Sequence, residues 1–388
     1  MNILTFTSLY PNAVNPQHGI FVETRLRHLI ADGVISSTVI APVPTFPFPV
    51  GPFRRYAASD DVPTRETRHG IDVHHPRFTV IPKLGMRLTP GSMARAARPL
   101  FREIVARLNI QLIDAHYFYP DGVAAAILAR EAGIPYVVTG RGTDLNVFPD
   151  YPAARRRILD TVSGAAACIT VSDSLRSRLI EIGAPAEKVC VLRNGVDTRL
   201  FAPGDRETVR ERLGLAGPVL IAVGNLAPEK GQMLIVEALQ RLPDVTLILV
   251  GDGADAARLG RHVEVQGLSG RVRMTGRVPQ TDLPDLYAAA DVSVLASERE
   301  GWPNVLLESM ACGTPVVTTD VGAAREIVTA PEAGLVAGQR SAESLADAIS
   351  ALLKNPPDRS ATRLHAEGFG WEETTRGQID LFRKILSS

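Results

Sequence analysis

The sequence predicts an α/β protein built from two doubly wound, Rossmann-like domains. Its 388 residues exceed one ordinary domain and fit two. Short apolar strands alternate with amphipathic helices along nearly the whole chain, and the alternation restarts once near the middle. Several strands are apolar runs without polar alternation, which is typical of parallel sheets buried on both faces. The alternating order then implies right-handed crossovers in each domain.

The first half is predicted to contain six strands separated by helices. We expect strands at 3–7, 38–41, 112–115, 136–139, 168–171 and 189–192, and helices at 20–31, 92–108, 123–132, 153–162 and 174–182. The segment 43–90 differs because it is rich in proline, which fixes φ and removes a hydrogen-bond donor. We therefore expect loops and short strands there.

The second half repeats the pattern. We expect strands at 219–223, 246–250, 272–275, 292–295 and 316–318, and helices at 231–242, 255–266, 283–289, 304–312, 341–353 and 372–386. Asn-Gly and Pro-Gly dipeptides within 194–203 mark a linker. The predicted domains are 1–198 and 199–370, with the last helix, 371–388, packing back on the first. Parallel sheets bind ligands at the carboxyl ends of their strands, so we expect a shared site between the two.

Cysteine use and the N-terminus indicate a cytoplasmic protein. Cys168, Cys190 and Cys312 are far apart and odd in number, so they cannot form a disulfide framework. The chain opens with a predicted strand rather than a signal peptide. No apolar run approaches the ~18–20 residues of a bilayer span.

Charge is balanced overall but unevenly distributed. The formal net charge is +6 over residues 1–199 and −6 over the remainder. A basic first half suggests an anionic partner, such as membrane lipid, a pyrophosphate-linked molecule or an acidic saccharide. Arg54-Arg55 and Arg155-Arg156-Arg157 are candidates for contact with the inner face of the cell membrane, and ordinary solvated charge is the alternative.

Two other function classes are disfavoured. A pI of about 7.1 and the lack of an aromatic-basic module argue against nucleic-acid binding. No Gly-x-Gly-x-x-Gly follows the first strand, which argues against a dinucleotide-dependent oxidoreductase.

The most informative segment is 300–316, in which Glu300 and Glu308 lie eight residues apart. Between them, Pro303 suits a helix start, because its missing N–H has no intrahelical partner there. A helix N-terminus offers N–H groups and a positive dipole end to a diphosphate, and Gly301 lets the backbone come close. Glu308 can accept hydrogen bonds from a ribose diol, and Glu300 from sugar hydroxyls. The alternative is two solvated glutamates beside a helix cap.

This segment closely resembles the Glu-x7-Glu motif of glycosyltransferase family 4, a large family of retaining enzymes with the GT-B fold. Other similarities cover most of the chain: Asn194-Gly195-Val196-Asp197, Glu229-Lys230-Gly231, Gly251-Asp252-Gly253, Gly276-Arg277-Val278, Asp114-Ala115-His116 and Gly140-Arg141-Gly142-Thr143-Asp144. The residues at 302–308 are similar to those of the family branch that assembles exopolysaccharides and teichuronic-type polymers. The resemblance implies an N-terminal acceptor domain and a C-terminal donor domain facing across a cleft.

The resemblance also implies a donor site. Lys230 would neutralise the leaving diphosphate, Glu308 would hold the ribose, and Glu300 would hold the donor sugar. Backbone near Arg277 and Val278 would receive the base. The remaining predicted donor contacts are Gly19, Asn225, Gly301, Trp302, Pro303, Asn304 and Val305.

On the acceptor side, the resemblance implies that His116 reaches toward the transferred sugar and acts in catalysis with Lys230 and Glu300. A structural role for His116 is the alternative. Arg141, Asp144 and Tyr117 are predicted to face the acceptor, although Asp144 could instead steady the Arg141 loop. Asp121 is expected to cap the helix at 123–132.

Two positions depart from the family's pattern. The family usually carries an Arg after the strand-end glycine, whereas this chain has Gly224-Asn225. Arg193, Arg141 and Arg277 are candidates for the missing cation. The frequent Gly-Gly of the first loop is His18-Gly19 here.

The predicted function is retaining transfer of a hexose-type sugar from a UDP-, GDP- or ADP-linked donor, without metal or other cofactor. The acceptor is expected to be a saccharide or a polyprenyl-pyrophosphate-linked molecule in cell-surface polysaccharide synthesis. A nucleotide-sugar epimerase or hydrolase, and a non-catalytic nucleotide-sugar-binding subunit, are the alternatives.

Overall fold

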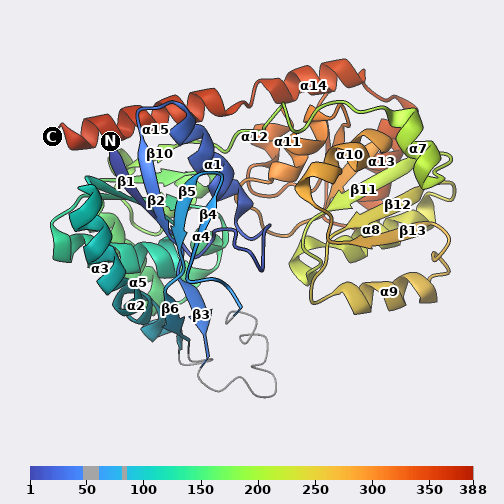
Figure 1. Ribbon diagram of the computed structural model, residues 1–388. Coiled ribbons are helices and arrows are strands. Elements are labelled where there is room, and N and C mark those ends of the chain that lie inside the picture. Colours follow the sequence, from blue (N-terminus) through green and yellow to red (C-terminus); the bar gives the residue numbers. More distant parts are fainter. Residues whose placement is uncertain (47–60, 81–84, 388) are drawn as a thin grey trace. The chain divides into compact units, whose positions relative to one another are not determined.

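The computed structural model describes residues 1–46, 61–80 and 85–387. The chain divides into two compact units, each with its own sheet (Figure 1). Unit 1 comprises Met1–Asn194 and Glu372–Ser388, and unit 2 comprises Gly195–Trp371. Arg54 and Arg55, assigned above to a membrane contact, lie outside the described residues.

Unit 1 is built on an eight-stranded sheet in the order β10-β9-β8-β7-β1-β2-β5-β4. Its strands are β1 (Asn2–Phe6), β2 (Ser36–Ile40), β4 (Arg65–Arg68), β5 (Ile71–His74), β7 (Leu112–His116), β8 (Tyr136–Gly140), β9 (Ala167–Thr170) and β10 (Val189–Val191). All neighbours pair in parallel except β4, which is antiparallel to β5. A separate parallel pair, β3 (Val43–Thr45) and β6 (Arg77–Thr79), continues beyond the carboxyl ends of β2 and β5.

Helices cover both faces of this sheet. They are α1 (Ile20–Ala31), α2 (Gly85–Leu108), α3 (Val123–Ala132), α4 (Thr143–Asn146), α5 (Pro152–Gly164), α6 (Asp173–Glu181) and α15 (Trp371–Leu386). The last helix, α15, contributes Ile379 and Phe382 to the same buried cluster as Ile3 and Leu26. The end of the chain is therefore part of the core of unit 1.

The prediction of loop up to residue 90 is wrong at its end, because α2 already begins at Gly85 and contains Pro90. A proline inside a helix leaves the carbonyl four residues earlier without its usual donor. That carbonyl belongs to Met86, and the hydroxyl of Tyr119 donates to it. A side chain from a distant element thus satisfies the group that Pro90 leaves free.

Unit 2 contains a six-stranded, fully parallel sheet in the order β13-β12-β11-β14-β15-β16. The strands are β11 (Val219–Val223), β12 (Thr246–Val250), β13 (Val272–Gly276), β14 (Val292–Leu295), β15 (Val316–Thr318) and β16 (Gly334–Val336). The helices are α7 (Arg206–Leu213), α8 (Gln232–Ala238), α9 (Ala256–Val265), α10 (Leu283–Ala289), α11 (Asn304–Ala311), α12 (Ala324–Ile327), α13 (Ala342–Lys354) and α14 (Arg359–Glu367).

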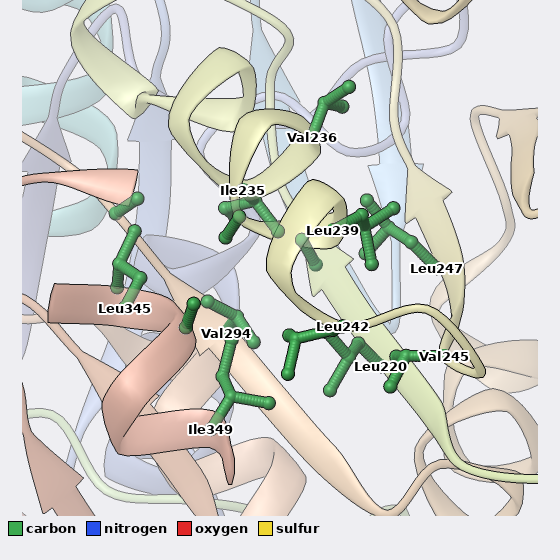
Figure 2. Close-up of a cluster of buried hydrophobic side chains, with 14 of the residues drawn as sticks. Leu220, Ile235, Val236, Leu239, Leu242, Val245, Leu247, Val294, Leu345 and Ile349 are labelled. Atoms are coloured by element: carbon green, nitrogen blue, oxygen red, sulfur yellow. The ribbon is translucent and has the colours of Figure 1, made fainter. Parts of the chain in front are cut away.

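The core of unit 2 lies between the sheet and helices α8 and α13. Leu220 and Val294 from the strands meet Ile235 of α8 and Leu345 and Ile349 of α13 (Figure 2). These side chains are at most 2% exposed. The apolar stretches predicted as strands and helices therefore pack against one another as the sheet and helix layers of unit 2.

The boundary between the units falls four residues before the predicted end of the first domain at 198. Residues 195–198 belong to unit 2 because they are bonded to its last turns. The Val196 N–H donates to the Phe369 carbonyl at 2.9 Å, and Arg363 donates to the Thr198 carbonyl at 3.3 Å. A Cβ at Gly195 would lie 2.7 Å from the Trp371 nitrogen, so only glycine fits there.

Both sheets have a topological switch point, where the connections that follow two neighbouring strands run in opposite directions along the sheet. In unit 1 the first strand, β1, lies between β2 and β7, and in unit 2 the first strand, β11, lies between β12 and β14. Ligands of open α/β sheets bind at the carboxyl ends of strands at such points. The site residues of each unit should therefore follow these strands.

Candidate active site

A lysine and a glutamate meet at the switch point of unit 2. Lys230 follows β11, Glu300 follows β14, and Lys230 Nζ lies 2.6 Å from Glu300 Oε1. The Ser297 hydroxyl donates to the same carboxylate oxygen at 2.7 Å. The side chains are 29% and 13% exposed, so a ligand can reach the pair. Two residues predicted for one site are thus brought together from positions 70 apart in the sequence.

The backbone around this pair is tightly packed. The Glu298 N–H donates to the Glu229 carbonyl at 2.7 Å, which joins the two loops. Gly231 has φ 69°, and a Cβ there would lie 2.2 Å from the Ala296 carbonyl oxygen. Glycine is required because it tolerates positive φ and lets the two backbones approach. This close contact holds Lys230 over the end of β14.

Glu308 lies on α11 in a half-buried position, unlike the freely solvated glutamate of the alternative interpretation. The Tyr287 hydroxyl donates to its Oε2 at 3.3 Å. Burial raises the pKa of Glu308 to about 7, although the hydrogen bond from Tyr287 opposes this shift. Tyr287 has no motif of its own in the sequence, and only the packing of α10 on α11 reveals it.

The start of α11 is built from buried residues. Gly301, Trp302 and Pro303 are buried, Pro303 occupies the N-cap, and the Trp302 ring lies 6.2 Å from that of Phe369. Asn304 and Val305 are partly buried. The Asn304 N–H donates to the Trp302 carbonyl at 3.0 Å, so this amide, predicted to face a phosphate, already has a partner.

The other predicted donor contacts of unit 2 lie at the same edge of the sheet. Asn225 is exposed just after β11, and its carbonyl accepts a bond from Gln232 Nε2 at 3.0 Å. Arg277 is exposed and Val278 is partly buried, directly after β13. Of the three arginines considered as substitutes at position 225, Arg277 is the one that unit 2 contains.

In unit 1, His116 ends β7 and is only 2% exposed. Its Nδ1 lies 2.5 Å from Arg141 Nη2, and its Nε2 lies 3.3 Å from Asp114 Oδ2. Because a guanidinium can only donate, Nδ1 accepts and the proton sits on Nε2. Burial lowers the pKa of His116 to about 4, despite the nearby Asp114 carboxylate. The imidazole is therefore neutral at ordinary pH.

Asp114 connects this histidine to the end of the chain. Gln378 of α15 donates to Asp114 Oδ2 at 2.9 Å, and Arg25 Nε donates to Gln378 Oε1 at 2.7 Å. Burial alone would raise the pKa of Asp114, but His116 and the arginines hold it below its usual value. Sequence reasoning missed Arg25 and Gln378 as site-supporting residues, because a contact across 264 residues leaves no local pattern.

Arg141 and Asp144 form the other wall of this network. Arg141 Nη1 donates to Asn194 Oδ1 at 2.9 Å, and burial lowers the pKa of the guanidinium to about 9. The Asp144 carboxylate is fully buried and accepts the N–H groups of Phe118, Arg141 and Gly142 at 2.8 to 3.0 Å. Of the two roles left open for Asp144, the structure therefore shows the steadying of the Arg141 loop.

Three more predicted residues lie around the switch point of unit 1. Tyr117 is half-buried at φ 80°, and its ring centroid lies 6.2 Å from that of Phe148 in an edge-to-face arrangement. Gly19 is the N-cap residue of α1 at φ 66°, and a Cβ there would lie 2.3 Å from the Leu9 carbonyl. The prediction that Asp121 caps the following helix is wrong. Its carboxylate accepts the Ser8 N–H across the switch point instead, and no side chain caps α3.

Neither a metal site nor a membrane-spanning helix occurs among the described residues. No three histidine, cysteine, aspartate or glutamate side chains within 1–46, 61–80 and 85–387 gather as a metal would require. In the same part of the chain, no helix is both long and apolar enough to cross a bilayer.

Comparison with known proteins places these two sites in a family. Residues 24–200 match the pattern described as Glycosyltransferase Family 4, and residues 205–368 match Glycosyl transferases group 1. The putative teichuronic acid biosynthesis glycosyltransferase TuaC of Bacillus subtilis is 33% identical over 358 residues, covering 90% of this chain and 88% of TuaC. This chain belongs to glycosyltransferase family 4.

A further relative agrees with the assignment to family 4, and two solved structures share the fold. The D-inositol 3-phosphate glycosyltransferase of Frankia alni is 33% identical over 304 residues, covering 71% of this chain and 74% of that protein. Sucrose-phosphate synthase from Thermosynechococcus elongatus superposes with a TM-score of 0.83 at 21% identity, covering 100% and 99% of the two chains. Anabaena Alr3699/HepE, solved in complex with UDP, superposes with a TM-score of 0.74 at 24% identity. The match covers 99% of this chain and 100% of HepE.

The predicted family, the GT-B fold and the transferase class are confirmed by these comparisons. The chain is a glycosyltransferase of family 4 whose two units are the two Rossmann-like domains of that fold.

Proposed function

We propose that this enzyme transfers a hexose-type sugar, with retention, from a UDP- or GDP-sugar to a saccharide or lipid-linked acceptor in cell-surface polysaccharide synthesis. The observation that carries the proposal is the Lys230–Glu300 pair at the switch point of unit 2. A cation and a carboxylate at this edge suit a leaving diphosphate and a sugar with free hydroxyls.

The donor assignment rests on unit 2 alone. A diphosphate would replace Glu300 as a partner of the Lys230 ammonium. The carboxylate oxygen freed in this way would accept a hydrogen bond from a sugar hydroxyl. Glu308, half-buried beside Tyr287, would accept hydrogen bonds from the two ribose hydroxyls. The relatives favour uridine as the base, since HepE is described in complex with UDP and with UDP-glucose.

Retention is proposed through a front-face route. The bond between the anomeric carbon and the diphosphate oxygen breaks, and the acceptor oxygen bonds to the same face of the sugar. The acceptor proton passes to the leaving phosphate, whose charge Lys230 stabilises. His116 would face the transferred sugar as a neutral group, because both ring nitrogens already have partners.

The acceptor assignment rests on charge and on one relative. TuaC is described as acting in teichuronic acid biosynthesis, and the first half of this chain carries the net positive charge that an anionic acceptor would favour. Lipid-linked acceptors would place the enzyme at the inner face of the cell membrane.

Thermal shift against nucleotides and nucleotide sugars, followed by product analysis, tests this function. A nucleotide at 100 times its dissociation constant should add about 2.7 kcal/mol of stability. UDP or GDP should shift wild type but not Glu308→Ala, with NAD as the inactive comparison. NMR of the glycosylated product should show the donor's anomeric configuration.

The alternatives give different products. An epimerase would convert the donor without an acceptor, and a hydrolase would release free sugar at the same rate with or without one. A binding subunit would show the thermal shift and no turnover. An inverted product, or a trapped covalent glycosyl-enzyme, would overturn the front-face route.

A further inference from the structure

Unit 1 contains a cavity of about 710 Å³ that none of the candidate site residues lines. It lies between β6 and the helices α2, α3 and α5, which contact one another and group together in Figure 1. β6 follows the carboxyl end of β5, so this part of the cavity wall lies at the same edge of the sheet as His116. Its wall includes Val123, the first residue of α3, seven positions after that histidine.

The cavity is strongly basic. Five arginines line it, contributed by four different elements, together with a single acidic residue, Asp160. They are Arg77, Arg87, Arg95, Arg130 and Arg157. Guanidinium groups repel one another at short range unless an anion lies between them, so this convergence favours an anionic ligand.

Several arginines of unit 1 form an ion pair with a carboxylate, as Arg65 does with Asp72 and Arg98 does with Glu131. In contrast, Arg87, Arg95 and Arg130 are exposed, and Arg157 is partly buried. None of these four has a carboxylate within 4.0 Å among the residues that the structure describes. Their donors are therefore available to a ligand, and the fork geometry of guanidinium suits phosphate oxygens.

The rest of the wall is apolar. Phe78 of β6, Leu88 of α2 and the α3 residues Val123, Ala126 and Ile127 line it. Leu88 is 58% exposed, so its side chain is accessible to an apolar ligand. A wall that combines cations with hydrocarbon matches a ligand with a phosphorylated head and an apolar chain.

We propose that this cavity binds the diphosphate of an isoprenoid-linked acceptor, with the first isoprene units against Leu88 and Ile127. The inference rests on the proposed acceptor class and adds a specific site for it. The arginines hold the diphosphate, and the glycan attached to it then extends along the carboxyl edge toward His116. A soluble phosphate compound offers the same head group without the chain, so the test must separate the two sources.

Calorimetric titration with farnesyl diphosphate, inorganic pyrophosphate and farnesol tests the site. Wild type should bind farnesyl diphosphate at least tenfold more tightly than pyrophosphate, and farnesol still more weakly. The double variant R95Q/R130Q should lose at least tenfold in affinity for farnesyl diphosphate. The matched control, R27Q/R107Q, removes the same charge from exposed positions of unit 1 outside the cavity and should lose less than threefold.

Other outcomes would overturn the inference. Equal losses in the two double variants would indicate a diffuse charge effect. Equal affinity for farnesyl diphosphate and pyrophosphate would indicate a soluble phosphate ligand instead of a lipid. The thermal shift by UDP should be the same in all three proteins, because the donor site lies in unit 2. Failure of UDP to shift even wild type would count against the proposed function and not against the cavity as a diphosphate site.

Discussion

Glu308 shows how burial and ligand binding act on one residue. Its carboxyl group, half-buried beside Tyr287, has a pKa of about 7 where an ordinary glutamate has about 4.5. In the free enzyme this group is half protonated near neutral pH. A ribose diol would favour the ionised form, because the carboxylate is the better acceptor of two hydrogen bonds.

The first prediction concerns stability of the ligand-free enzyme against pH. A folded-state pKa above the unfolded one means that the folded protein binds more protons, so stability falls as pH rises from about 4.5 to about 7. Glu308→Gln should remove up to about 3 kcal/mol of this fall. Urea unfolding of both proteins between pH 5 and pH 8 measures it. Parallel curves for the two proteins would mean that Glu308 has an ordinary pKa.

The second prediction concerns Lys230, whose ammonium lies 2.6 Å from Glu300. Lys230→Ala should reduce kcat by about 10²–10³, since a fixed cation at the leaving group is lost in a partly desolvated site. Lys354→Ala, at the exposed end of α13, is the matched control and should be neutral. Steady-state kinetics with unchanged far-UV circular dichroism checks this. A normal kcat in the first variant would remove Lys230 from the mechanism.

Among the elements, the turn that carries Lys230 depends on a glycine. Gly231 combines φ 69° with a backbone contact that leaves no room for a Cβ. Another glycine of unit 2, Gly260, lies within α9, where an added Cβ would meet nothing within 4 Å. The two glycines therefore form a natural pair for comparison.

The third prediction uses this pair. Gly231→Ala should destabilise the protein by about 1–3 kcal/mol and weaken nucleotide binding, because the loop must move away from Ala296. Gly260→Ala should be neutral or stabilising by up to about 1 kcal/mol, since alanine favours helix. Thermal unfolding with and without nucleotide measures both effects. If Gly231→Ala retains full affinity, the close contact does not position Lys230.

The helix α15 is the element that links the chain end to the histidine network of unit 1. Phe382 is completely buried in the core of unit 1, while Gln378 on the same helix bonds both Arg25 and Asp114. One face of the helix therefore supplies packing and supports the histidine network.

The fourth prediction follows from this packing. Phe382→Ala should cost about 3–5 kcal/mol of unfolding free energy, through lost burial and the cavity left behind. Arg383→Ala, the adjacent and mostly exposed residue of α15, should change stability by less than about 0.5 kcal/mol. Chemical denaturation of the two variants gives the comparison. Similar small effects in both would show that α15 is only loosely attached.

At the scale of the whole molecule, the reaction is proposed to need the protein's own charges and no added cation. Lys230 and the first turn of α11 are proposed to meet the charge of the leaving diphosphate. This expectation comes from the family resemblance and from the residues that follow β11 and β14.

The fifth prediction is therefore that turnover persists in excess EDTA. The rate should stay within about twofold of the untreated enzyme, since a factor of two corresponds to only ~0.4 kcal/mol of barrier. Readdition of Mg²⁺ or Mn²⁺ should have no larger effect. Loss of activity with EDTA and its recovery with one of these cations would contradict the metal-independent route.

The sequence alone determined the fold class and the family, and it predicted the residues of the donor site. Buried parallel strands are mostly apolar, so β1, β7, β11 and β14 could be located from their short apolar stretches. The Glu300 to Glu308 segment could be found because its residues are adjacent along one loop and helix. The sequence missed α7 and α14, which are mostly polar and bury few side chains, and the short strand β16.

Only the tertiary structure decided which distant side chains meet. Asp114 joins Gln378, Asp121 reaches Ser8 instead of capping α3, and five arginines converge on one cavity. Each of these contacts depends on how helices pack over the edge of a sheet, which a local pattern of residue types does not encode. The same applies to the pKa of Glu308, because desolvation depends on what surrounds a group and not on its neighbours in the chain.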